Sequence, residues 1–284
     1  MRYTRFAPLF LVLAISSSPA YETTELKPHT LEAFLLYSRL TEAQFLQQVA
    51  SDQFLRIDTP GEIDNRAEAL QTIDNGGVFI TKLKTLDDGE EVDVKNGIVH
   101  HWYGAVLIRD VALDDVLSLV RDYDIHHDVF PDVDESQTLP SSDGDVYDVR
   151  YRFRKKKVLT VVLETEHHVR YTRLSNDRAY SMSRTTKVQE VDDPDGKNEP
   201  KLPDTGRGFL WRINSYWRFE QRAEDTFIEC ESISLTRDIP LLLRPMISPF
   251  VNGVPRETLE KTLESARDRL LQASPAGGAH VDRR

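Results

Sequence analysis

Residues 105–124 read AVLIRDVALDDVLSLVRDYD, and this stretch decides how the rest of the chain is interpreted. Its first residues are apolar, as in a strand, whereas the later part repeats apolar residues at helical spacing. Asp114 and Asp115 stand where the helix would begin, and acidic residues stabilise a helix N-terminus because that end of the dipole is positive. We therefore expect a strand over Ile98 to Ile108 and an amphipathic helix over about Leu113 to Arg121.

The chain from Val78 onward shows the two-residue alternation of apolar and polar side chains that is typical of half-buried strands. Polar, Asp-rich or Gly-containing turns separate the strand-like segments, and strands that follow one another without helices predict an antiparallel sheet. The candidate strands are Val78–Lys84, Ile98–Ile108, Val146–Phe153, Val158–Tyr171, Ala179–Val188, Gly208–Phe219 and Phe227–Thr236.

A second amphipathic helix is predicted near the end of the chain. It starts near Pro255, because proline is favourable in the first turn of a helix. The segment Ile239 to Val254 before it is apolar but contains three prolines, so we expect a bent or broken helical approach there. The apolar face of the helix consists of Leu259, Leu263, Ala266 and Leu270.

The first residues of the chain have the composition of an export signal. Arg2 and Arg5 precede the apolar run Leu9 to Ile15, which is too short for a stable membrane span, and small residues follow up to Ala20. We predict a signal peptide over residues 1–20. An uncleaved anchor or the frayed terminus of a cytosolic protein is the alternative interpretation.

Residues 21–75 are built differently from the sheet that follows. Apolar residues recur there at helical spacing, and Thr41 with Gln44 forms a candidate capping box. We predict a helical N-terminal segment, which carries no family resemblance. At the other end, the small and polar residues of the stretch 273–284 predict a disordered tail.

The bulk composition excludes some classes of partner. The formal net charge is −11, and it becomes −13 if Arg2 and Arg5 leave with the signal. A body this acidic argues against nucleic-acid binding, because phosphate contacts need a positive face. Cys230 is the single cysteine, so the chain has no internal disulfide and its stability must come from packing.

The order of strand, helix, further strands and long C-terminal helix resembles the START/SRPBCC superfamily, which includes polyketide cyclases, coenzyme Q-binding proteins and lipid-transfer domains. The resemblance implies an α+β helix-grip fold, in which a curved antiparallel β-sheet wraps around the C-terminal α-helix, here with an N-terminal helical extension. We assign the START/SRPBCC-like domain to residues 76–272. The motifs that carry the resemblance are residues 105–124, Phe130-Pro131-Asp-Val133, Asn214-Ser-Tyr-Trp-Arg-Phe219 and Phe227-Ile-Glu-Cys-Glu231.

The resemblance also implies a ligand cavity on the concave face of the sheet. Alternation along each strand selects the side chains that share this face, and apolar residues near the C-terminal helix complete the set. A solid core without a ligand would use the same residue types and is the alternative. The predicted ligand-binding residues are Tyr151, Phe153, Val161, Leu163, Trp211, Ile213, Trp217, Met246, Phe250, Leu259 and Leu263.

Catalysis and cofactor binding find little support in the sequence. It has no nucleophile elbow, no glycine-rich phosphate loop and no paired-cysteine motif, and its adjacent histidine pairs lack the spacing of a zinc site. Tyr103, Arg184 and Glu229 could serve acid–base chemistry, but an outward ion pair is their expected use. We predict no metal, no cofactor and no catalytic residue, and we leave open whether the chain is an enzyme.

One basic run stands out in this acidic chain. Arg152, Arg154, Lys155, Lys156 and Lys157 could contact an anionic membrane during ligand delivery, although a solvated hairpin tip is the simpler interpretation.

These patterns lead to one principal hypothesis. It is the binding or transfer of a hydrophobic small molecule (a lipid, an isoprenoid or a similar compound) in the cell envelope, by an exported, periplasmic or secreted protein that is soluble after signal cleavage. The alternatives are a cyclase-, dehydratase- or hydrolase-like enzyme that uses the same cavity, and an envelope protein-interaction module.

Overall fold

The computed structural model describes residues 23–157, 160–192, 199–238 and 244–273, and for residues 244–252 it describes the backbone only. The predicted signal peptide and the predicted tail beyond Ala273 lie outside the described residues.

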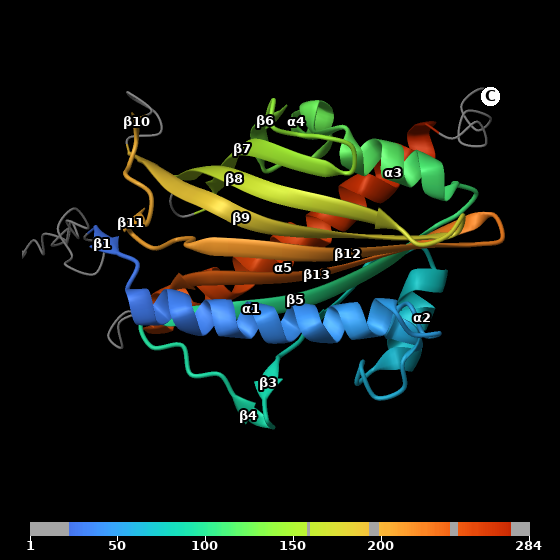
Figure 1. Cartoon of the computed structure of the whole chain (residues 1–284), viewed down its shortest axis with the longest axis horizontal. Coiled ribbons are helices and arrows are strands. Elements are labelled where there is room, and N and C mark those ends of the chain that lie inside the picture. Colours follow the sequence, from blue (N-terminus) through green and yellow to red (C-terminus); the bar gives the residue numbers. More distant parts are fainter. Residues whose placement is uncertain (1–22, 158–159, 193–198, 239–243, 274–284) are drawn as a thin grey trace, which may run out of the picture.

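A large antiparallel sheet forms the centre of the molecule (Figure 1). The order of its strands is β2-β5-β13-β12-β9-β8-β7-β6, and β10 pairs with β9. Two short pairs, β1 with β11 and β3 with β4, stand apart from it. The strands are β1 Thr24–Glu25, β2 Phe79–Lys82, β3 Leu86–Asp87, β4 Glu90–Glu91, β5 Gly97–Ile108, β6 Val133–Thr138, β7 Val146–Lys156, β8 Thr160–Arg173, β9 Arg178–Asp192, β10 Glu199–Pro200, β11 Thr205–Gly206, β12 Arg212–Arg222 and β13 Asp225–Arg237.

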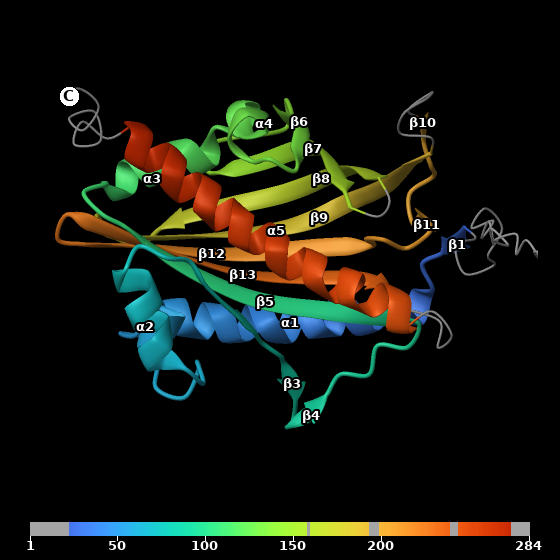
Figure 2. The ribbon, with the colours of Figure 1, turned by 180° about the vertical axis from the view of Figure 1, so that it is seen from behind.

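Helix α5, Arg244–Ala273, crosses one face of this sheet diagonally (Figure 2). Its residues Leu259, Leu263, Ala266 and Leu270 are buried in a core that also takes in helix α3, Leu113–Arg121, and alternate residues of β5, β12 and β13. Gly104 of β5 permits the close approach, because a Cβ atom there would lie 2.5 Å from Cδ1 of Leu263. A curved antiparallel sheet against a long C-terminal helix is the helix-grip architecture, so the predicted α+β fold is confirmed.

The expected bent or broken approach over Ile239 to Val254 contains no break from Arg244 onward, because α5 is one continuous helix there, and residues 239–243 lie outside the described residues. Pro245 stands in the first turn, where the missing N–H group has no helical acceptor in any case. Pro249 and Pro255 each remove one backbone hydrogen bond, and the helix continues through both.

The sequence pattern does not predict three elements between α3 and β7. They are the 3₁₀-helix η4, Tyr123–Ile125, the short helix α4, His126–Val129, and strand β6. Most residues of β6 are polar because it is the strand at one end of the sheet order, with a neighbour, β7, on only one side. Such a strand lacks the apolar alternation by which the others were found.

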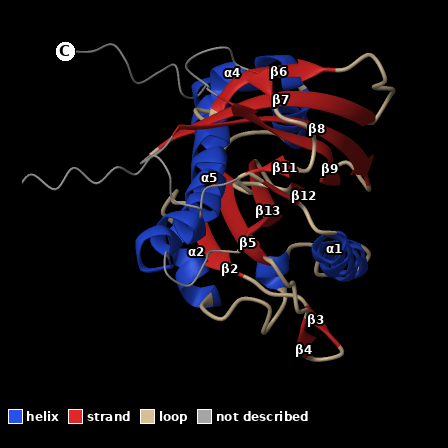
Figure 3. Cartoon of the chain, turned by 90° about the vertical axis from the view of Figure 1, so that its left-hand side faces the viewer, coloured by secondary structure: helices blue, strands red, loops and turns tan. Residues whose placement is uncertain are grey.

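The opposite face of the sheet is covered by the N-terminal segment. It contains helix α1, Pro28–Val49, the 3₁₀-helix η3, Arg56–Asp58, and helix α2, Arg66–Asp74. Figure 3 shows α1 and α5 on opposite sides of the sheet. A second apolar core fills this outer interface, so the part of the sheet formed by β5, β9, β12 and β13 is buried on both faces.

Thr41 does not begin a helix, because α1 is continuous through it. Its hydroxyl donates to the carbonyl of Tyr37 one turn earlier, at 2.9 Å, so the predicted capping box is wrong. Within residues 23–75 the structure has the helices α1, η3 and α2 and the short strand β1, joined by irregular segments.

Candidate binding cavity

A cavity of about 390 Å³ lies between the concave face of the sheet and α5. This volume falls within the range of roughly 300–1,000 Å³ that is usual for small-ligand sites. Strands β7, β8, β9, β12 and β13 form its floor and walls, α5 crosses it, and the segments around α4 and before β12 close its ends. Most of the surface facing the cavity is apolar or aromatic, as hydrophobic-ligand sites require.

Most of the predicted site residues whose side chains are described line this cavity. Strand alternation is the reason, because odd-numbered positions of β12 and of the facing parts of β7 and β8 point to the concave face. Their role in ligand binding stays a prediction. The lining residues that the sequence predicted are Tyr151, Phe153, Val161, Leu163, Ile213, Trp217 and Leu259.

Trp211 does not line the cavity, which corrects its predicted place. It precedes β12 and is buried in the outer core, next to the turn at Gly208. Alternation fails for Trp211 because it lies outside the regular strand, which begins at Arg212.

Leu263 is also absent from the cavity lining. Its side chain projects from α5 and is fully buried against Gly104 of β5, so it holds the helix on the sheet and does not face the cavity. Met246 and Phe250 lie in the part of α5 for which only the backbone is described, so their side chains cannot be compared with the prediction.

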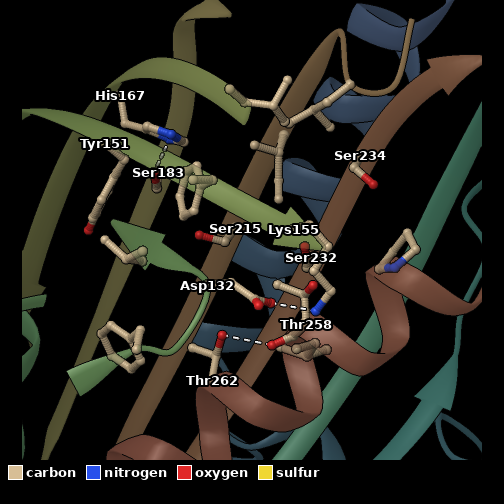
Figure 4. A pocket seen from close by; sticks show the side chains of 18 of the residues that line it. Asp132, Tyr151, Lys155, His167, Ser183, Ser215, Ser232, Ser234, Thr258 and Thr262 are labelled. Atoms are coloured by element: carbon tan, nitrogen blue, oxygen red, sulfur yellow. Dashed lines mark hydrogen bonds and ion pairs between the residues drawn. The ribbon is translucent and has the colours of Figure 1, made fainter. Parts of the chain in front are cut away.

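Five serines on the floor of the cavity were not singled out from the sequence. They occupy the concave positions of three adjacent strands, where Ser215 of β12 is paired with both Ser183 of β9 and Ser232 of β13. Figure 4 shows Ser183, Ser215, Ser232 and Ser234 on this floor. The alternation with Trp217 that marked the strand face already contained Ser215, so the signal was present. The serines are Ser181, Ser183, Ser215, Ser232 and Ser234.

One wall of the cavity carries hydrogen-bonded histidine and tyrosine side chains. Nε2 of His126 lies 3.3 Å from the carbonyl oxygen of Leu119, and a carbonyl only accepts, so Nε2 carries the proton of the neutral ring. Nδ1 of His126 therefore accepts from the hydroxyl of Tyr151 at 2.8 Å. Burial lowers the pKa of His126 to about 4 and raises the pKa of Tyr151 well above its usual value, so both groups are neutral at pH 7.

His167 is a second buried histidine in the cavity wall. Its Nε2 lies 2.9 Å from the hydroxyl of Thr165, and its Nδ1 lies 3.5 Å from that of Ser183. Burial lowers the pKa of His167 to about 4, so this ring also carries no charge at neutral pH.

The segment before β12, which forms part of the rim, is held by one carboxylate. Glu190 of β9 accepts three consecutive backbone N–H groups, those of Arg207 at 2.7 Å, Gly208 at 2.8 Å and Phe209 at 3.0 Å. The segment can wrap this carboxylate because Gly206 and Gly208 adopt positive φ angles, which favour glycine. Glu190 thus positions Phe209 at the cavity.

The basic run is largely paired with acidic side chains. Arg152 meets Glu164 at 2.7 Å and Arg154 meets Asp134 at 2.6 Å. Lys156 is exposed.

The two remaining lysines join the end of β7 to α5. Lys155 lies 2.6 Å from Asp132 and 3.4 Å from Glu257, and Lys157 lies 2.7 Å from Glu257. Hydrogen bonds from Lys157 and Lys261 lower the pKa of the Glu257 carboxyl to about 2. Much of the positive charge of the run is therefore balanced locally.

The three residues considered for acid–base chemistry lie on the other face of the sheet. The hydroxyl of Tyr103 donates to Glu229 at 2.6 Å, beneath the N-terminal segment. Arg184 forms two hydrogen bonds of 2.6 Å with Glu42 of α1. These positions are directed away from the cavity. Arg184 forms the expected ion pair, but the expected outward position is wrong for Tyr103 and Glu229, which are fully buried.

Within the described ranges, no group of three or more histidine, cysteine, aspartate or glutamate side chains is placed to hold a metal ion. None of the helices in those ranges carries an apolar stretch long enough to cross a bilayer.

No protein-family model and no curated protein matches the chain. Solved structures are similar to it at low identity. A STAR-related lipid transfer protein from Xanthomonas axonopodis is 20% identical with a TM-score of 0.43, over 67% of this chain and 98% of that one. Human STARD10 is 12% identical with a TM-score of 0.47, over 82% and 88%. The Zhui aromatase/cyclase from Streptomyces is 14% identical with a TM-score of 0.41, over 63% and 99%. The START-like helix-grip fold of this chain is given by its own sheet order and by the helix α5 across the concave face.

Proposed function

We propose that the protein binds a hydrophobic small molecule, such as a lipid or an isoprenoid, and carries it in the cell envelope without chemical change. The observation that carries the proposal is the cavity of about 390 Å³ between the sheet and α5, with its largely apolar and aromatic lining. Burying an apolar ligand there is favourable by about 25 cal/mol for each Å² removed from water.

The protonation states of the cavity residues support carriage over catalysis. A general base works best when its pKa lies near the working pH, and the pKa values of His126 and His167 are both about 4. At pH 7 these rings are neutral hydrogen-bonding groups held by Tyr151, Leu119 and Thr165. They suit recognition of an uncharged ligand.

The envelope location and the membrane contact are parts of the same proposal. Their support is the signal-like composition of residues 1–20 and the basic run at the end of β7. Because Lys155 and Lys157 tie this strand to Glu257 of α5, an anionic membrane would compete with Glu257 for both lysines.

The two tryptophans on either side of the sheet provide a matched test. Trp217 lines the cavity and stacks on Phe219, whereas Trp211 is buried in the outer core. We expect Trp217→Leu to weaken binding of the uncharged fluorescent probe N-phenyl-1-naphthylamine about tenfold, since apolar contact is lost. Trp211→Leu should leave the affinity of the folded protein within about twofold of wild type.

Native mass spectrometry and solvent extraction of the purified protein complete the test. A co-purifying apolar molecule that is depleted in Trp217→Leu supports the proposal. The proposal fails if no apolar molecule co-purifies and the probe does not bind. Equal losses of probe affinity in Trp217→Leu and Trp211→Leu would show that the cavity is not the binding site.

An enzyme that uses the same cavity is the second candidate. The hydrogen bond from Tyr151 to His126 favours it, because this pair joins a phenol to a base whose orientation is fixed by Leu119. If the pair is catalytic, incubation of the protein with its extracted ligand gives a product of altered mass. Tyr151→Phe would then abolish that product and leave binding intact, whereas an unchanged ligand supports carriage.

A further inference from the structure

The serines on the cavity floor form a row of hydroxyl groups across the sheet. Ser183, Ser215 and Ser232 are direct neighbours in the strand register, and adjacent strands lie about 4.8 Å apart. The row is therefore about 10 Å long, and apolar residues of the same strands, such as Ile213 and Trp217, lie beside it. A strip of hydrogen-bonding groups thus crosses an otherwise apolar floor (Figure 4).

The hydroxyls of this row have capacity for further hydrogen bonds. Ser234 is only 3% exposed and lines the cavity, and among the described residues its hydroxyl has no hydrogen-bond partner. The hydroxyl of Ser232 likewise has none within those ranges. Ser215 accepts from the indole N–H of Trp217 at 3.3 Å, which leaves its own proton available. These hydroxyls face the cavity, so a ligand atom that pairs with one of them gains a hydrogen bond in apolar surroundings.

The floor around the row carries no ionised side chain at neutral pH. Its positions on β9, β12 and β13, namely 181–183, 213–219 and 230–236, place serine, tryptophan, phenylalanine, isoleucine, threonine and cysteine side chains at the cavity. His167 beside Ser183 is neutral as well. The charged residues that line the cavity stand at other positions, namely Asp132 before β6, Arg154 and Lys155 at the end of β7, Arg207 before β12, Arg237 and Asp238 at the end of β13, and Lys261 on α5. A charged group buried on this floor would lack a counter-ion.

We propose that the ligand is an uncharged, mainly apolar molecule with two or more hydroxyl or carbonyl oxygens along one edge, and that these oxygens pair with Ser183, Ser215, Ser232 and Ser234. This inference rests on the proposed function and narrows its ligand class. It separates such a ligand from plain hydrocarbons and from lipids whose charged group would have to enter the floor.

A matched pair of probes tests the inference. Benzil and bibenzyl share two phenyl rings on a two-carbon link, and benzil carries two adjacent carbonyl oxygens that bibenzyl lacks. Calorimetric titration of the full-length protein should show tighter binding of benzil. A single neutral hydrogen bond is worth about three- to tenfold in affinity, so Ser215→Ala and Ser232→Ala should each weaken benzil by about that factor. Bibenzyl binding should change less than about twofold.

Ser118→Ala, on the exposed face of α3, is the matched control and should change neither affinity. Thermal unfolding of each variant near the wild-type temperature verifies the fold. Equal affinity of wild type for the two probes, or equal losses for both probes in the serine variants, overturns the hydroxyl-row inference and leaves the proposed function standing. If wild type binds neither these probes nor N-phenyl-1-naphthylamine, the proposed function itself fails.

Discussion

Arg218 is fully buried on the outer face of the sheet, among charged partners. Its guanidinium lies 3.5 Å from Glu229 and 3.7 Å from Glu231. Arg56 of η3 reaches Glu231 at 3.2 Å, so residues of the N-terminal segment and of the sheet share one buried network. Burial alone would raise the pKa of Glu231, but Arg56, His101 and Arg218 together lower it to about 2.

Removal of the central cation of this network should be costly. Arg218→Met leaves Glu229 and Glu231 short of positive partners, and breaking a buried pair in this way costs roughly 3–5 kcal/mol. Arg184→Met removes an exposed arginine from the same face and should cost under about 1 kcal/mol. Urea unfolding monitored by circular dichroism measures both, and a similar loss in the two variants would contradict the importance of the buried network.

Buried histidines make stability sensitive to acid. Burial lowers the folded-state pKa of His100, His126 and His167 from 6.5 to about 4. Above pH 6.5 the rings are neutral in both states. Between pH 6.5 and 4 the unfolded chain binds protons that the folded chain does not, so stability falls as the pH drops.

The loss for each of these histidines is roughly 2 kcal/mol at pH 5 relative to pH 7.5. His167→Gln should therefore show a smaller fall in unfolding free energy between these two pH values than wild type does. The exposed His29→Gln is the control and should match wild type. An equal pH dependence in all three proteins would refute the assignment.

The rim segment before β12 depends on a side chain from another strand. Three of its N–H groups have Glu190 as their acceptor, so the carboxylate fixes the backbone from Arg207 to Phe209 against the cavity. Helix α5 depends in a similar way on Gly104, which admits Leu263 to the sheet. The shape of the cavity is thus set by contacts between elements that are distant in sequence.

Glu190→Gln places an amide NH₂ group where two carboxylate oxygens accept hydrogen bonds. We expect a loss of about 1–3 kcal/mol of stability, since at least one buried N–H group loses its acceptor. Hydrogen exchange of the amides of residues 207–209 should accelerate, while exchange in β5 stays unchanged. Glu199→Gln on the exposed strand β10 is the control. If this variant accelerates exchange of the amides of residues 207–209 equally, Glu190 has no specific role in holding the segment.

The molecule has two cores, one on each face of its sheet. The inner core joins the sheet to α3 and α5, and the outer core joins it to α1, η3 and α2. Tyr103, Tyr216 and Ile233 are fully buried only because the N-terminal segment covers them. The described part of the N-terminal segment, residues 23–75, therefore completes the burial of the sheet.

A chain that begins at Gly76 should fail to fold cooperatively. It would expose the apolar outer face together with the buried charges of Arg218, Glu229 and Glu231. Thermal unfolding and dye binding to exposed apolar surface report the effect. A chain that ends at Ala273 should melt as the full-length protein does. If the chain that begins at Gly76 melts cooperatively near the wild-type temperature, the N-terminal segment is dispensable for folding.

Periodicity alone predicted most strands of the sheet and both amphipathic helices, because strand alternation and helical spacing are local properties. Only together with the family resemblance did it predict residues that line the cavity, such as Tyr151 and Leu163. It also identified the strand face that holds Ile213, Ser215 and Trp217. It did not separate Trp211 from that face, since the start of β12 depends on hydrogen bonds to β9 and β13.

Only the tertiary structure decided what covers each face of the sheet. The sequence led us to expect outward ion pairs at Tyr103 and Glu229, and packing of the N-terminal segment made them buried. The pairing of β9, β12 and β13 likewise brings their serines into one row, although these strands span about fifty residues of chain. Local pattern fixes which way a side chain points, but its neighbours are set by long-range pairing, and burial and ligand chemistry depend on those neighbours.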